Sequence, residues 1–374
     1  MLNEGINQKK SANVPENVFS LPTKHTDQSS FEDCTRSETS YHTMTTNCIF
    51  KLLQDAGIKT SVVTSSQECE IIPIEWACWR IATDMYLRRN PHAVEENRLS
   101  PPKVEMFWKN GDNNQLVISV ERLVAAGISC AGLVLGQMEV DIMNRSIVAM
   151  LEILERTCLA NGIVIVNLKV KFGVEANKKE IVLADVVGYE SRSQIYTDIL
   201  GQQNVECPLS PENQCKVVLL TESLLHLGYC EKIKGACAVY NIPCELRVIS
   251  AYTGPAEILD LKSQYEGDVI PMVFITVAGK SNSLASVMSA NITYPVINCP
   301  LVTAEWTAQD LCSAVRMAEG IGFSTVLSPE AAAQFAAHIL GLSNPLLWSK
   351  LRTCTLNKWI AMKQADVKLR ECSI

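Results

Sequence analysis

Between residues 215 and 300, short runs of apolar residues alternate with segments that have the pattern of helices. Three of these runs are CKVVLLT (215–221), CELRVIS (244–250) and PMVFITVAG (271–279). Strands that are apolar along their whole length are typical of a parallel sheet covered by helices on both faces. The second half of the chain is therefore predicted to be an α/β domain, in which ligands bind at the carboxyl ends of the strands.

The first half has a different pattern, in which strands and helices do not alternate regularly. Its spacing of apolar residues predicts helices over 46–57, 117–138 and 145–162, and strands over 69–82, 103–108, 162–175 and 180–187. This half is predicted to be an α+β domain. In the second half, further helices are predicted over 227–240, 255–267, 304–317, 329–341 and 345–372, with a strand over 293–300 and a loop of small residues before it.

Composition excludes several classes of protein. The net charge is −7 and no basic block is present, which argues against nucleic acid as a partner. No apolar run approaches the ~18 residues of a membrane helix, and the acidic N-terminus does not resemble a targeting peptide, so a cytoplasmic protein without a membrane partner is predicted. The fifteen cysteines include no Cys-x-x-Cys pair, which favours free thiols over zinc ligands or disulfides.

Many long segments resemble one family, the bifunctional phosphoribosylaminoimidazole (AIR) carboxylase / phosphoribosylaminoimidazole-succinocarboxamide (SAICAR) synthase of purine synthesis. They include CIFKLLQDAGIKT, CEIIPIEWACWRIAT and KEIVLADV in the first half, and LGYCEKIKGAC, IPCELRVISAYTGP and STVLSPEAAAQFAAHILGLSN in the second. The resemblance implies a SAICAR-synthase-like α+β domain over 46–200 that lacks the ATP-covering lobe. A linker (201–214) and a flavodoxin-like AIR carboxylase domain with long C-terminal helices (215–374) follow, and residues 1–45 are predicted to be irregular or disordered.

The resemblance also implies two activities. The carboxylase, a lyase, adds CO2 to an aminoimidazole ribonucleotide, and the synthase, an ATP-dependent ligase, then joins aspartate to the new carboxylate with ATP and Mg²⁺. Carboxylase domains of the family form octamers, so an octamer-like homo-oligomer is expected. These cofactors and this assembly are implied by the family alone.

The carboxylase motifs are only partly retained. Of the family's Gly-Ser-x-Ser-Asp turn, only Ser223 agrees, because residues 222–226 read ESLLH. Tyr252, after Ser250, stands at the position of the catalytic histidine, and a phenol that stays protonated at neutral pH is predicted to be inactive there. The third motif is nearly intact, so the predicted substrate-binding residues are Ser223, Ser250, Gly279, Lys280, Ser281 and Asn282.

The synthase motifs are more eroded, and Glu75, Lys169 and Asp185 are their predicted remnant. Trp79 stands at the position of an arginine, and Asn167 and Lys171 stand at the positions of two acidic residues. No metal site is predicted, since Mg²⁺ requires oxygen ligands and Lys171 is a cation. Asp185 is expected to pair with Lys171 across the hairpin. Arg80 is expected to face the opposite side of its strand from Trp79.

Three hypotheses follow for the function. The first is a divergent paralogue with impaired or lost catalysis and a structural or regulatory role, alone or in a mixed oligomer with an intact paralogue. The second is an active purine-biosynthesis enzyme, mainly at the CO2-using carboxylase step. The third is a sensor that binds a purine-precursor ribonucleotide without chemistry.

Overall fold

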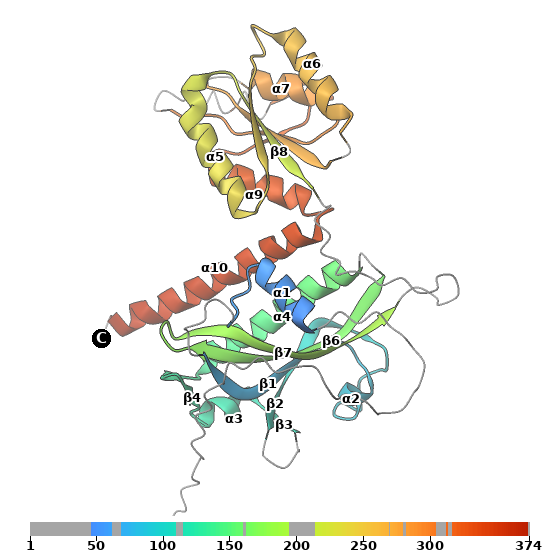
Figure 1. Ribbon diagram of the computed structural model, residues 1–374, viewed down its shortest axis with the longest axis vertical. Helices are drawn as coiled ribbons and strands as arrows, with labels where there is room; N and C mark the ends of the chain where they lie inside the picture. The colour runs from blue at the N-terminus through green and yellow to red at the C-terminus, as the bar shows by residue number, and fades with distance from the viewer. Residues whose placement is uncertain are drawn as a thin grey trace, which may run out of the picture. The chain divides into compact units, whose positions relative to one another are not determined.

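Two five-stranded sheets form the framework of the computed structural model (Figure 1). The structure describes residues 46–61, 69–109, 115–159, 162–193, 214–268, 270–279, 282–303, 312 and 316–372. All of them belong to one compact unit, His42–Ile374. The predictions for residues 1–45, for nearly all of the linker and for most of the helix over 304–317 lie outside the described residues.

The first sheet is antiparallel and has the strand order β3-β2-β1-β6-β7. Its strands are β1 (Cys69–Ile81), β2 (Arg98–Lys109), β3 (Gln115–Ile118), β6 (Ile163–Glu175) and β7 (Glu180–Ser193). β6 and β7 form the predicted hairpin. A short helix, α2 (Asp84–Leu87), follows β1, and the strands β4 (Ser129–Cys130) and β5 (Leu133–Val134) pair with each other.

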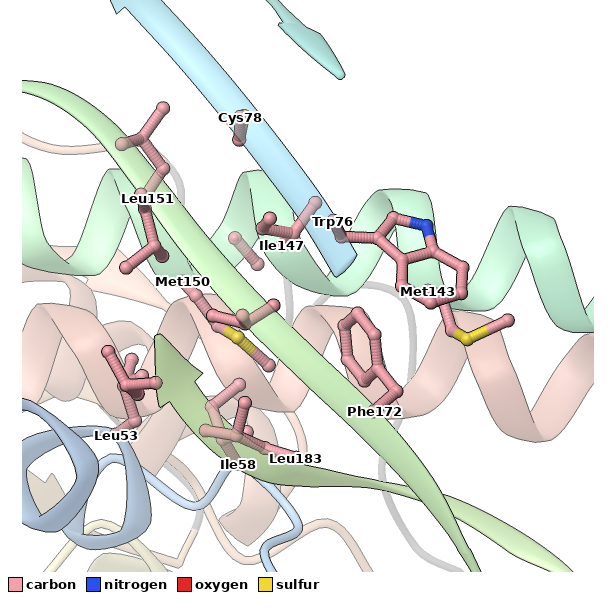
Figure 2. Packing of buried hydrophobic residues seen from close by; sticks show 14 of the residues in the cluster. Leu53, Ile58, Trp76, Cys78, Met143, Ile147, Met150, Leu151, Phe172 and Leu183 are labelled. Carbon is pink, nitrogen blue, oxygen red and sulfur yellow. The ribbon is translucent and has the colours of Figure 1, made fainter. Parts of the chain in front are cut away.

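Helices α1 (Thr46–Asp55) and α4 (Gln137–Leu159) bury one face of this sheet. Alternate β1 residues, including Trp76 and Cys78, point into this core, as a strand with a period of two requires (Figure 2). The ring of Trp76 meets Phe172 of β6 edge to face, with centroids 5.3 Å apart. The last helix, α10 (Pro345–Cys372), packs against α4 and contributes Leu356 to the same core.

The second sheet is parallel throughout, as predicted, with the order β12-β11-β10-β8-β9. Its strands are β8 (Lys216–Thr221), β9 (Cys244–Val248), β10 (Met272–Val277), β11 (Val296–Asn298) and β12 (Ser324–Thr325). Helices α5 (Leu227–Val239) and α9 (Pro329–Leu340) cover one face, and α6 (Pro255–Glu266) and α7 (Ser283–Asn291) cover the other (Figure 1). The apolar strands are therefore buried on both sides, and the flavodoxin-like architecture is confirmed.

Two predicted elements were wrong. Residues 117–138 do not form one helix; they form β3, the short helix α3 (Val120–Ala125), β4 and β5. The backbone turns at Gly127, Ala131 and Gly132, which all have positive φ, and an α-helix cannot contain such residues. The loop of small residues after β10 is instead the helix α7, because Leu284, Ala285 and Met288 bury one side of it.

The described cysteines are all free thiols, as predicted. Burial raises the pKa of several of them, including Cys78 and Cys299, so these thiols are poor nucleophiles at neutral pH. Within the described residues, no group of three His, Cys, Asp or Glu side chains is placed to hold a metal ion. A search of the same residues found no helix with the length and apolar character needed to span a membrane.

Candidate functional site

The parallel ladders align the carboxyl ends of three strands. Thr221 at the end of β8 lies opposite Val277 of β10 and Val248 of β9. The turns that follow the three strands therefore leave the sheet at one edge. We call this edge, formed by residues 221–226, 249–254, 278–279 and 282–283, the strand-end site.

Two predicted binding residues, Ser223 and Ser250, lie in these turns, and their hydroxyl oxygens accept hydrogen bonds from the local backbone. Ser223 Oγ accepts from Leu225 N at 3.1 Å and begins the 3-10 turn Leu224–His226. Ser250 Oγ accepts from the amides of Tyr252 and Thr253 at 3.3 and 3.4 Å. Neither hydroxyl donates a hydrogen bond within the described part of the chain, while both oxygens hold the turns in shape.

His226 brings an imidazole into the strand-end site. Its Nδ1 lies 3.3 Å from Thr221 Oγ1, and Thr221 Oγ1 also donates to the Ser223 carbonyl at 3.3 Å. Since Thr221 has one hydroxyl hydrogen, this network assigns the proton of a neutral ring to Nδ1 and the lone pair to Nε2. A Cβ placed on Gly279 would lie 3.8 Å from Nε2, so the basic nitrogen borders a glycine of the site.

Glu222 adds a half-buried carboxylate beside this imidazole. Ser283, the first residue of α7, donates to Glu222 Oε1 at 3.4 Å. Burial raises the pKa of the Glu222 carboxyl, while the Ser283 hydrogen bond and the nearby His226 act in the opposite direction. The half-buried turn therefore contains a carboxyl group, that of Glu222, next to the imidazole of His226.

Tyr252 and Leu225 do not fill this site. Their exposed fractions are 70% and 91%, so both side chains extend into solvent. Of the third predicted motif, Lys280 and Ser281 lie outside the described residues. Asn282 is described, and its Nδ2 lies 3.2 Å from Met317 Sδ.

The predicted synthase remnant lies in the first sheet and forms a row across three strands. Lys171 of β6 is opposite the buried Glu75 of β1 on one side and opposite Asp185 of β7 on the other. Lys171 and Asp185 are thus neighbours as expected, although no ion pair joins their side chains in the described part of the chain. With a lysine between the two acidic residues, this row does not fit Mg²⁺, which prefers oxygen ligands alone.

The next positions along these strands are also altered. Trp79 and Asn167, which stand where the family has an arginine and an acid, face each other in the β1–β6 ladder, and both are fully buried. Lys169 lies beside them, with Nζ 5.9 Å from the centroid of the Trp79 ring. Arg80 faces the other side of the sheet as predicted, where it binds Glu155 of α4 at 2.5 Å. An apolar ring thus occupies the position at which a cation was expected.

The structure brings the predicted residues together in the strand-end site but not in the synthase remnant. Ser223, Ser250 and Gly279 are brought to one edge, whereas Glu75, Lys169 and Asp185 are distributed across the first sheet. Sequence reasoning missed the contacts of His226, Thr221 and Ser283. The only signal for them was a histidine five residues after the end of an apolar strand.

Two sequence families match the chain, one in each half. SAICAR synthetase matches residues 26–198 and AIR carboxylase matches residues 216–359. The first of these matches begins within the stretch predicted to be irregular, which lies outside the described residues.

Several relatives match this chain across both of its halves. The rat bifunctional phosphoribosylaminoimidazole carboxylase/phosphoribosylaminoimidazole succinocarboxamide synthetase is 50% identical over 365 residues, covering 88% of this chain and 86% of the relative. The human protein of the same name is 49% identical with the same coverage. A solved structure of Treponema denticola PurE is 27% identical and covers 41% of this chain and 97% of its own, with a TM-score of 0.40.

Proposed function

Because this chain belongs to the family of bifunctional AIR carboxylases/SAICAR synthetases, we propose that it acts in purine synthesis at the carboxylase step. Its substrates would be CO2 and an aminoimidazole ribonucleotide, as implied by the names of its relatives. The observation that supports this function is the imidazole of His226, held by Thr221 beside Gly279 in the strand-end site. High identity to enzymes across both halves also favours retained activity.

The proposed chemistry needs one base. A carbon–carbon bond forms between the ring carbon of the aminoimidazole and CO2, and the proton on that carbon must leave. Imidazole is the side chain best suited to accept a proton near neutral pH. His226 Nε2 carries the lone pair and borders Gly279, which has no side chain of its own. We assign the general base to His226 on this geometry.

The activity should be lower than that of the relatives. Tyr252 stands where the family has its histidine, and its phenol extends into solvent. Loss of a positioned acid–base group costs ~10²–10⁴-fold in rate, and a base in another place restores only part of it. The Glu222 carboxylate also repels the substrate phosphate wherever the two approach each other.

Carboxylation by the purified full chain tests this proposal. The wild type should consume the aminoimidazole ribonucleotide in bicarbonate buffer, and His226→Asn should lower kcat by about 10²-fold or more while leaving the thermal unfolding midpoint unchanged. His338→Asn, at an exposed position of α9, is the matched control and should keep full activity. Equal activity in His226→Asn and wild type would reject the role of His226. No turnover by the wild type would reject the proposed function.

A second candidate is a family member without catalysis, with a structural or regulatory role. Tyr252 at the histidine position and Lys171 between Glu75 and Asp185 favour it. On this hypothesis the wild type does not convert the aminoimidazole ribonucleotide, but it assembles with an active relative and changes the activity of that relative. Mixing the two purified proteins and measuring both mass and rate distinguishes the candidates, and calorimetry with the ribonucleotide distinguishes a sensor from a protein without a ligand.

We further propose that the ATP-dependent ligase step is lost. The row Glu75, Lys171, Asp185 contains a cation at its centre, and Trp79 fills the position of an expected arginine. Incubation with ATP, Mg²⁺, aspartate and the carboxylated ribonucleotide should release no phosphate above background, and release at the rate of an intact relative would contradict the proposal.

A further inference from the structure

A cavity of about 150 Å³ lies beside α10, and its lining includes no residue of the strand-end site or of the row Glu75, Lys171, Asp185. Its walls come from α4, β7 and α10 and from residues next to α1. The apolar lining includes Ile58, Ile142, Phe172, Leu183, Leu356 and Ile360. Figure 2 shows Ile58, Phe172 and Leu183 in this region of the core.

The size and lining of the cavity define the apolar part of a ligand. A cavity of this volume accommodates a benzene-sized ring against its aliphatic and aromatic side chains, while polar and charged residues form the rest of the lining. One wall also carries the hydroxyl of Ser146, a residue of α4 that is 7% exposed and makes no hydrogen bond among the described residues. The cavity thus suits a small ring with a polar substituent.

The charges at the cavity define that substituent. Four charged residues line it, and three of them are engaged in contacts: Lys59 binds Glu180 at 2.7 Å, and Glu139 Oε2 accepts from Gly136 N at 3.0 Å. The fourth, Lys179, has no carboxylate partner among the described residues. Its side chain lies along Gly132, where an added Cβ would be 3.7 Å from Nζ. An unpaired ammonium at an apolar cavity favours an anionic group on the ligand.

We propose that this cavity binds a small aromatic carboxylate, with the ring between α4, β7 and α10 and the carboxylate at Lys179. A carboxylate fits better than a neutral group because it pairs with Lys179, the cation of the lining that has no carboxylate partner among the described residues. It fits better than an inorganic anion because most of the wall is apolar. Since α10 forms one wall, the bound ligand holds residues 356–364 of this helix against α4 and β7.

Titration of the full chain with phenylacetate tests this site, with benzyl alcohol as the neutral probe of similar size. Phenylacetate should bind saturably in calorimetry, raise the unfolding temperature, and slow amide exchange in residues 356–364. Lys179→Met should weaken phenylacetate binding about tenfold and leave benzyl alcohol binding unchanged, because a charge-assisted contact is lost. Lys178→Met, at the neighbouring exposed position, is the matched control and should bind as the wild type does.

A second variant tests the cavity itself. Ser146→Leu places a larger side chain in the cavity and should abolish binding of both probes. The unfolding curve of this variant verifies that the chain is folded. Absence of saturable phenylacetate binding to the wild type would overturn the proposal. Equal affinity of the wild type and Lys179→Met for phenylacetate would also overturn it, because the carboxylate would then not be at Lys179.

Discussion

At the scale of single residues, Glu222 connects the strand-end site to stability. Its carboxyl pKa is raised above the ordinary 4.5, chiefly by burial. A raised pKa means that the folded state holds this proton more tightly than the unfolded chain does. The stabilising contribution of the protonated form is present below about pH 4.5 and is lost as the pH rises through the folded-state pKa.

Glu222→Gln should therefore raise the free energy of unfolding at neutral pH, and the difference from the wild type should shrink toward zero as the pH falls below 4.5. Urea unfolding at a series of pH values measures this difference. Glu371→Gln, at an exposed position near the end of α10, is the control and should show no such dependence. A variant that is less stable than the wild type at neutral pH would contradict the assignment.

At the scale of elements, one carboxylate on a helix binds two arginines on neighbouring strands. One of these arginines is buried and the other is exposed. Glu155 of α4 binds Arg80 of β1 at 2.5 Å and Arg98 of β2 at 3.3 Å. The Arg80 side chain is 7% exposed and that of Arg98 is 64% exposed. The two contacts share one carboxylate and differ in burial and in length, so a comparison between them measures the combined effect of the two differences.

Arg80→Met should cost about 3–5 kcal/mol of unfolding free energy, because it leaves the Glu155 carboxylate in a partly buried site without its closer partner. Arg98→Met should cost about 0–1 kcal/mol, as is typical of exposed ion pairs. Chemical denaturation of both variants measures the two values. Equal losses would show that burial of this pair has no energetic consequence.

Helices and strands were predictable wherever the apolar residues of a long segment kept one regular spacing. β6, β8 and α10 were predicted because their apolar spacing is regular and their neighbours supply the buried face. The segment 117–138 was not, because its apolar residues fit a helix until Gly127 and Gly132 take positive φ, which apolar spacing does not encode. The site residue His226 was not predictable either, since its contact with Thr221 depends on the shape of the turn and its proximity to Gly279 depends on the register between β8 and β10.

At the scale of the whole molecule, the described chain exposes large apolar side chains on and next to α10. Leu342, Met362 and Leu369 are 74%, 57% and 69% exposed. Scattered apolar residues are common on surfaces, but several near one helix favour contact with another chain. We propose that this helix contributes to an oligomer.

Light scattering should give a mass several times the 41.2 kDa of one chain. Leu369→Glu should lower that mass, because a charge in an apolar interface must be desolvated. Lys368→Glu, one position away, changes charge without changing the apolar surface and should have a smaller effect. A wild type of 41.2 kDa at micromolar concentration would contradict the proposal.

The contact between α10 and α4 has a consequence for how the chain is made. Arg352 of α10 binds Glu152 of α4 across 200 residues of sequence. At ~5–20 residues per second, α4 leaves the ribosome roughly 10–40 s before its partner helix exists. Throughout that interval the nascent first half lacks the side chain of Leu356 that completes its core. The final maturation of the N-terminal half therefore waits for α10 to be translated, so a nonsense mutation before Arg352 damages both halves.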